Sequence, residues 1–147
     1  MNSPARRVAL SSIVVVALAC ALAIAPPAAA VSTTVVISQV YGGGGNSGAT
    51  LKNDFVELFN RGATTVSLNG WSIQYASSAG TTWAVTNLTN VSLAPGQYYL
   101  VQEAQGTGGT VNLPTPDATG TIAMAAGAGK VALVSGTTAL SGSCPAG

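Results

Sequence analysis

Asp54–Asn60 reads DFVELFN, and the alternation within this short run is the clearest indication of the fold. Successive side chains of a β-strand point to opposite faces, so a period of two assigns each residue to one face. One face then carries Phe55, Glu57 and Phe59, and the other carries Val56 and Leu58. The run ends at Arg61-Gly62, as a strand that leads into a turn does.

Similar short runs lie on both sides of this stretch, separated by Gly, Asn and Pro turns. They are Val35–Tyr41, Val66–Leu68, Trp71–Tyr75, Thr82–Leu88, Tyr98–Val101, Thr121–Ala125 and Lys130–Val134. Beyond the first thirty residues, no run keeps the period of about 3.6 that an amphipathic helix shows. About seven short strands without crossover helices predict an all-β sandwich or barrel rather than a parallel α/β sheet.

Two of these runs predict which side chains reach the core. Alternation in the run after the Asn69-Gly70 turn predicts Trp71, Ile73 and Tyr75 inside and Ser72 and Gln74 outside. In the pair Tyr98-Tyr99, one ring must face outward if the strand is regular.

The first thirty residues have a composition of their own. Arg6-Arg7 precedes the apolar run Val8–Ile24, and small alanines end the segment at Ala30. A basic start, an apolar run and an A-x-A-like site form the signature of a secretory signal peptide. We therefore expect a helical signal peptide over residues 1–30, cleavage between Ala30 and Val31, and a secreted, extracellular bacterial domain over residues 31–147.

The first thirty residues also fit other kinds of segment. An uncleaved membrane anchor stays open, although an apolar run of about 17 residues is at the lower limit for a span and no basic stop-transfer segment follows. Arg6-Arg7 also fits a twin-arginine signal. Cys20 lies inside the apolar run, with Ala17 where a lipobox has Leu, so we expect it to be lost with the signal.

Charge is sparse after residue 30. Three cations stand against four carboxylates, for a net charge of −1: Lys52, Arg61 and Lys130 against Asp54, Glu57, Glu103 and Asp117. A groove for phosphate backbones needs clustered Lys and Arg. We therefore expect no basic nucleic-acid groove in this region, and no stable membrane span once the signal is removed.

The chain has no histidine, which removes Ser-His-Asp and Cys-His catalysis and His-based metal sites. The carboxylates of Asp54 and Glu57 remain, but three residues apart on a strand they point to opposite faces. Glu57 is either a functional carboxylate or a structural one bonded to backbone amides, Arg61 or Lys52, and a lone Glu within a strand favours the structural role. We expect no catalytic, cofactor-binding or metal-binding residue.

Three weaker patterns in the sequence indicate possible ligands. Gly42–Gly48 resembles a phosphate-binding loop in composition only, because no helix follows it, and a flexible loop is expected there. Asn46, Asn53 and Asp54 offer oxygen ligands for Ca²⁺, but no loop spacing enforces that site. The tryptophans and tyrosines raise the question of a carbohydrate-stacking face, although most of them should lie in the core.

One cysteine remains after residue 30, namely Cys144. An odd cysteine in an exported protein indicates an unpaired thiol or a partner elsewhere. We expect a fragment in which the disulfide partner of Cys144 lies outside the chain.

Four segments, taken in order, are similar to the bacterial lamin-tail domain. They are VVISQVYGGGGNSG (Val35–Gly48), NDFVELFNRG (Asn53–Gly62), VSLNGWSIQY (Val66–Tyr75) and LAPGQYYLVQEA (Leu93–Ala104). The resemblance runs from about Val35 to Cys144 and implies an immunoglobulin-like β-sandwich. Related sequences continue past Cys-Pro with another strand and a second cysteine, so the resemblance implies a sandwich that lacks its last strand here.

The same resemblance implies a function. In secreted bacterial proteins such domains often precede an endonuclease/exonuclease/phosphatase-type catalytic domain, and they carry no catalytic residues. It therefore implies a non-catalytic module that binds an unknown protein, cell-surface or polymer ligand and tethers a hydrolase located downstream. Two alternatives stay open, a secreted nuclease or phosphatase active only in the full-length protein, and a structural cell-surface domain.

Overall fold

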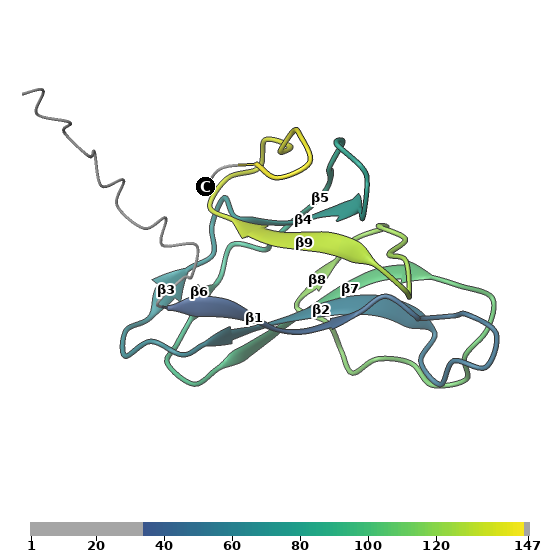
Figure 1. Ribbon diagram of the computed structural model, residues 1–147. Helices are drawn as coiled ribbons and strands as arrows, with labels where there is room; N and C mark the ends of the chain where they lie inside the picture. The colour runs from purple at the N-terminus through teal and green to yellow at the C-terminus, as the bar shows by residue number, and fades with distance from the viewer. Residues whose placement is uncertain (1–33, 146–147) are drawn as a thin grey trace, which may run out of the picture.

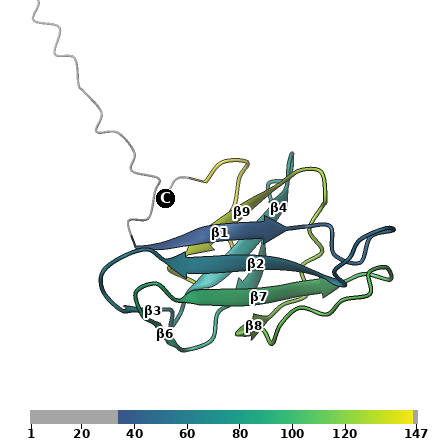
Figure 2. The same ribbon diagram turned by 90° about the horizontal axis from the view of Figure 1, so that it is seen from below.

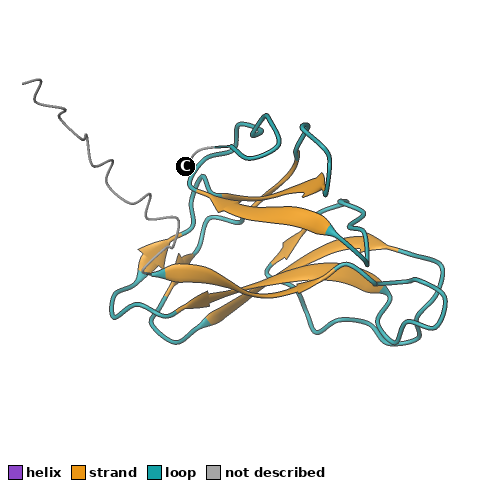
Figure 3. Cartoon of the chain, in the orientation of Figure 1, coloured by secondary structure: helices purple, strands orange, loops and turns teal. Residues whose placement is uncertain are grey.

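The computed structural model describes residues 34–145, so the predicted signal peptide and its cleavage site at Ala30 and Val31 lie outside the described residues. The described part contains strands, turns and loops but no helix (Figure 3). It therefore also contains no helical segment that could cross a membrane. The strands are β1 (Val35–Tyr41), β2 (Asn53–Asn60), β3 (Val66–Ser67), β4 (Ser72–Ser77), β5 (Ala84–Asn87), β6 (Ser92–Leu93), β7 (Tyr98–Gln105), β8 (Ala118–Thr119) and β9 (Gly129–Val134).

The strands form two packed layers, as an immunoglobulin-like sandwich does. One sheet has the order β1-β2-β7-β8 and the other the order β5-β4-β9, while β3 and β6 form a small pair at one end. Figure 1 shows β4, β5 and β9 above β1, β2 and β7. All pairings are antiparallel except that of β7 with β8. The predicted all-β sandwich is confirmed.

The core lies between the two sheets, and period-two alternation supplies it. From β2 and β7 the inward side chains include Val56, Leu58, Tyr99 and Val101, which are all buried. Ile73 of β4 packs against them from the opposite sheet, in the same buried cluster. Each such side chain stabilises the fold by about 1.5–3 kcal/mol relative to an exposed position. The predicted two faces of β2 and the outward ring at Tyr98 are confirmed.

The prediction that Ser72 and Gln74 face solvent is wrong, because both are fully buried. Residues 135–143, which follow β9, pack over the outer face of β4. Ser72 Oγ donates to Gly136 O at 2.6 Å, and Gln74 Nε2 donates to Thr138 O at 2.9 Å. Leu140 N donates to Gln74 Oε1 at 2.8 Å. We call residues 135–143 the covering segment.

The predicted strand at Thr121–Ala125 is also wrong. This stretch belongs to residues 120–128, which link β8 in one sheet to β9 in the other and which we call the crossing segment. Two of its backbone amides find side-chain carboxylates instead of a partner strand. A strand-like sequence does not distinguish the two cases, because the backbone amides of an extended segment can donate to side chains as well as to a neighbouring strand.

The two glycine-rich loops, Gly42–Gly48 and Gly106–Gly109, lie against each other backbone to backbone at the end of β2 and β7. Gly108 N donates to Gly45 O at 2.7 Å. A Cβ built on Gly45 would lie 2.2 Å from Gly106 Cα, and the φ of Gly45 is 67°. Only glycine fits such an approach with that backbone conformation. These glycines therefore serve a close contact between two loops.

Candidate binding face

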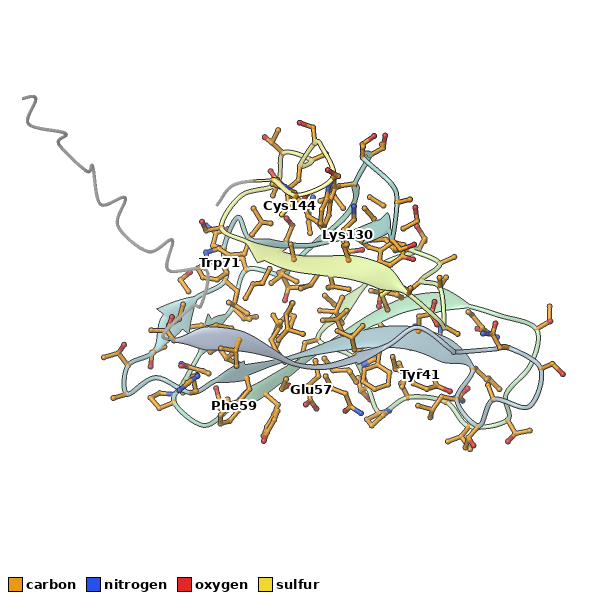
Figure 4. The ribbon with its side chains drawn as sticks, in the orientation of Figure 1. Tyr41, Glu57, Phe59, Trp71, Lys130 and Cys144 are labelled. Carbon is orange, nitrogen blue, oxygen red and sulfur yellow. The ribbon has the colours of Figure 1, made fainter. Side chains whose placement is uncertain are left out.

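The outer face of the sheet formed by β1, β2 and β7 carries two pairs of aromatic rings. Tyr41 stacks on Phe55 with ring centroids 5.5 Å apart, and Phe59 contacts Tyr98 with centroids 4.6 Å apart. Figure 4 shows Tyr41, Glu57 and Phe59 on the side of this sheet that faces away from β9. Each pair joins neighbouring strands, so the register of the sheet rather than local sequence brings the rings together.

The two pairs differ in exposure. Phe55 is only 7% exposed, whereas Tyr98 is 60% exposed, the largest value among the exposed large apolar side chains of the described residues. Phe59 beside it is half-buried. The accessible part of the face is therefore the Phe59–Tyr98 pair, which offers an apolar ring surface with a hydroxyl at its edge.

Glu57 lies between the two aromatic pairs, and its surroundings are structural. Ser38 Oγ donates to Glu57 Oε1 at 2.7 Å, and the same hydroxyl lies 3.1 Å from Glu57 O. Ser38 stands where the register of β1 shifts between Ile37 and Gln39. Neither Lys52 nor Arg61 pairs with this carboxylate in the described structure, so Ser38 replaces the partners that the sequence suggested. The carboxylate holds the irregular edge strand to β2.

Asp54 lies on the inner face of β2 and is 4% exposed. Its Oδ1 accepts a hydrogen bond from Gly44 N and its Oδ2 one from Met124 N, both at 2.8 Å. Asn53 Nδ2 donates to Glu103 O at 2.9 Å. Both oxygens of Asp54 thus hold backbone amides, and Asn53 presents a donor. Within residues 34–145 no group of three or more His, Cys, Asp or Glu residues could hold a metal ion.

Glu103 is a buried carboxylate that the sequence reasoning missed. It lies on the inner face of β7 and is 1% exposed. Its Oε2 accepts a hydrogen bond from Ile122 N at 3.0 Å, which fixes the crossing segment next to Asp54. The signal was present in the sequence, since Tyr99, Val101 and Glu103 share one face of β7 by period two.

The environment of Glu103 favours its neutral form. Burial raises the pKa of the Glu103 carboxyl above its ordinary value. The Thr86 hydroxyl and the Ile122 amide lower this pKa, and the negative charge of Asp54 raises it further. Glu103 Oε1 and Thr86 Oγ1 are both buried, and neither makes a hydrogen bond of good geometry. A Cβ on Gly120 would lie 2.2 Å from each of Glu103 Oε2 and Thr86 Oγ1. Glycine at position 120 therefore leaves room for the Glu103 carboxylate and the Thr86 hydroxyl.

A cleft lies on each side of the crossing segment. One, of about 300 Å³, opens between Val40 of β1 and Val131 of β9, and the other, of about 480 Å³, opens beside β5 at Trp83. Tyr75 lines both, and its Oη accepts a hydrogen bond from Ala125 N at 3.0 Å. Neither cleft is lined by a carboxylate, a cysteine or a cation.

Cys144 is a free, exposed cysteine just beyond the covering segment. The neighbouring chain is fixed by Trp83, whose Nε1 donates to Gly142 O at 3.0 Å, and by Lys130, whose Nζ donates to Ser143 O at 2.9 Å. Lys130 Nζ also lies 5.5 Å from the centroid of the Trp83 ring. The proposed disulfide of Cys144 with a partner outside the chain stays a prediction.

Comparison with known families agrees with this architecture. The family model for the lamin tail domain matches residues 28–141, which includes all nine strands. No curated protein matches the chain. The matched range covers most of the sequence, and the family has the immunoglobulin-like fold that the two sheets show. The chain belongs to the lamin tail domain family.

Proposed function

We propose that this chain is a non-catalytic binding and tethering module, exported from the cell, which holds an attached hydrolase near its target. We assign the binding role to the outer face of β1, β2 and β7. Membership of the lamin tail domain family supports a binding or structural role. Export and the attached hydrolase rest on the N-terminal segment of the sequence and on the segment resemblance.

The observation that carries the proposal is the bare aromatic face. The covering segment closes the outer face of β4, whereas the outer face of β1, β2 and β7 has an accessible ring pair, Phe59 and Tyr98, at one end. An exposed apolar patch on a small domain marks an interaction site more often than it serves stability. Tyrosine is also enriched at binding hot spots, because it offers a large area at a low entropic cost.

The charges near this face define the ligand further. Glu57 is its only carboxylate among the residues of β1, β2 and β7 that point outward, and Ser38 already hydrogen-bonds to it. No Lys or Arg lies on these three strands. A neutral face of this kind fits an uncharged surface, such as an apolar protein patch or a neutral polymer, better than a phosphate backbone.

A retention assay tests the proposal directly. Purified protein is mixed with cell-envelope fractions and with insoluble polymers, and the bound fraction is measured for wild type, Tyr98→Ala and Val111→Ala. The Tyr98 variant should bind about ten-fold more weakly, which corresponds to about 1.4 kcal/mol. Val111 is 46% exposed and lies in the loop between β7 and β8, beside Leu51, rather than on β1, β2 or β7, so its variant should bind as wild type does.

Two results would overturn the proposal. One is the absence of wild-type retention on every fraction, and the other is equal loss for the Tyr98 and Val111 variants. A Tyr98→Phe variant separates ring area from the hydroxyl, since it retains the contact with Phe59. Retention by Tyr98→Phe at the wild-type level would assign the binding to the ring.

A further inference from the structure

The sandwich has four edge strands, and β1 differs from the other three. β8 has only two residues, β5 has four, and β9 includes Lys130. β1 has seven residues, VVISQVY, with neither a charge nor a proline. Its only strand partner in the described part of the chain is β2, and Figure 2 shows it at the margin of its sheet. Proteins usually protect long edges with charges, prolines, short strands or β-bulges, because unpaired backbone groups attract another strand. Of these devices β1 has only the register shift between Ile37 and Gln39.

The register shows which backbone groups of β1 point away from β2. Arg61 N donates to Thr34 O at 2.9 Å, and in an antiparallel pair every second residue makes such bonds. The backbone N–H and C=O groups of Val35 and Ile37 therefore point away from β2, although Val35 itself is completely buried. The register shift after Ile37 moves this alternation by one residue, so that Val40, opposite Val56, is directed outward as well.

The side chains of Ile37 and Val40 lie on the same face of the sheet. Ile37 pairs with Leu58 and Val40 with Val56, and both of these partners lie in the core. Ile37 and Val40 therefore lie on the inner face of the sheet. Val40 is nevertheless 46% exposed, because it sits beside the cleft of about 300 Å³ at the edge. An apolar side chain placed next to Val40 would cover it.

The strand is complementary to itself. If two β1 strands pair antiparallel about a two-fold axis, Ile37 of one copy can lie opposite Val40 of the other, with the irregularity at Ser38 on the axis. Both residues have outward backbone groups, so they exchange a pair of hydrogen bonds on each side of the axis. Both side chains then lie on the same face, and Ile37 covers Val40. No charge meets a like charge, since the strand has none.

We propose that two copies of this chain associate through their β1 edges, joining their four-stranded sheets into one continuous sheet with Ile37 opposite Val40. The occupant of the edge is thus a second copy of this chain. A contact limited to one strand edge is smaller than a standard interface, so the dimer is weak and reversible. The proposal does not depend on the aromatic face, because β1 contributes its edge here rather than its outer surface.

Sedimentation equilibrium tests this pairing over about 10 μM to about 1 mM, a range in which weak dimers dissociate. The protein is the form recovered after expression of the whole chain, kept under reducing conditions so that Cys144 forms no disulfide. Val40→Lys places a charge at the edge, which is a natural defence against strand pairing. Its dissociation constant should rise at least ten-fold above wild type.

The matched control is Val111→Lys. Val40 and Val111 are both valines and both 46% exposed, but Val111 lies in a loop beside Leu51. Its variant should dimerise as wild type does. A second variant, Val40→Pro, removes an outward N–H without touching a bond to β2, and it should also weaken the dimer while its fluorescence spectrum stays that of the folded protein.

A cross-link fixes the register. In a Cys144→Ser background, Ile37→Cys combined with Val40→Cys should give a disulfide-linked dimer on oxidation, because hydrogen-bonded partners have Cα atoms about 5.5 Å apart. The two positions are about 10 Å apart within one strand, so they cannot bond to each other. Cys144→Ser with Val111→Cys is the control and should give no disulfide-linked dimer.

Three results would overturn the proposal. They are a wild-type protein that remains monomeric up to about 1 mM, a dimer that Val40→Lys leaves unchanged, and a cross-link that forms as well with Val111→Cys. None of these results would bear on retention through Tyr98, so failure of the dimer and failure of the binding face are distinguishable.

Discussion

The outer faces of the two sheets differ in an unexpected way. On β4 the outward side chains are the polar Ser72 and Gln74, and the covering segment buries both completely. On β2 and β7 the outward side chains include Phe59 and Tyr98, and this ring pair is left accessible. The polar face is thus closed and the aromatic face is open, the reverse of what burial of apolar surface alone would give.

This difference separates two roles of a sheet face. The covering segment supplies hydrogen-bond partners that match Ser72 and Gln74 atom for atom, so the polar face contributes to stability. The aromatic face contributes much less to stability, because part of its apolar area stays in water. Variants on the two faces should therefore change different properties.

The largest effect is expected at Gln74. Gln74→Ala leaves Thr138 O and Leu140 N without their side-chain partner, and each unsatisfied buried group costs about 1–3 kcal/mol. We expect a loss of about 3 kcal/mol in the free energy of unfolding, measured by urea titration. Gln102→Ala, on the outer side of β7, should cost less than about 0.5 kcal/mol. Equal losses for the two variants would remove the distinction between the faces.

The next effect concerns the end of the covering segment. Trp83→Phe removes the bond from Nε1 to Gly142 O, and the loss should be about 1 kcal/mol. Hydrogen exchange should become faster at the amide of Gly142, which donates to Thr81 O. Trp71→Phe is the control and should leave this amide protected. Unchanged exchange in Trp83→Phe would mean that the tryptophan does not hold the segment.

Glu103 differs from Gln74 in its hydrogen bonding. One buried carboxylate oxygen of Glu103 makes no hydrogen bond of good geometry, whereas the side-chain amide of Gln74 is fully hydrogen-bonded. Burial raises the pKa of Glu103 above its ordinary 4.5. The folded state therefore holds the proton more tightly than the unfolded state. The protonated Glu103 therefore contributes to the free energy of unfolding. This contribution is fully present below about pH 4.5 and is lost as the pH rises through the pKa of Glu103 in the folded state.

Glu103→Gln should abolish this loss, since an amide keeps an acceptor for Ile122 N and does not titrate. The measurement is the free energy of unfolding at about pH 4 and about pH 8. Glu57→Gln, on the outer face of β2, should retain the fall between these values. A Glu103→Gln variant whose free energy of unfolding falls between these pH values as much as that of wild type would contradict the assignment to Glu103.

The smallest effect on stability is expected at Tyr98. Tyr98→Ala loses the contact with Phe59, which is worth about 0.5–1.5 kcal/mol for a well-packed pair and less at an exposed ring. We expect about 0.5 kcal/mol in urea titration, with the spectrum of the folded protein unchanged. A loss as large as that of Gln74→Ala would show that the aromatic face is structural.

The sequence predicted those features that depend on one strand. The faces of Asp54–Asn60 and the outward ring of Tyr98 follow from the period of two, and the structure confirms them. The burial of Gln74 could not be predicted in this way, because its partners lie 64 and 66 residues later in the chain. The binding face was only partly predictable, since the Phe59–Tyr98 pair requires the register between β2 and β7.

The crossing segment shows a different limit of prediction from sequence. Its composition, from Thr121 to Ala125, resembles that of a strand, but its amides bind the side chains of Asp54 and Glu103. Sequence periodicity reports which face a residue occupies and does not report which atom accepts its N–H. The placement of Glu103 on the inner face was predictable from Tyr99 and Val101, whereas its partner at Ile122 was not.

The covering segment limits how early during synthesis the domain can finish folding. Gln74 is synthesised long before Thr138 and Leu140, its hydrogen-bond partners, and Trp83 before Gly142. The outer face of β4 therefore cannot be fully covered until about residue 142 has left the ribosome. Long-range pairing of this kind also folds slowly. Until the covering segment has left the ribosome, the side chains of Ser72 and Gln74 have no hydrogen-bond partner from it.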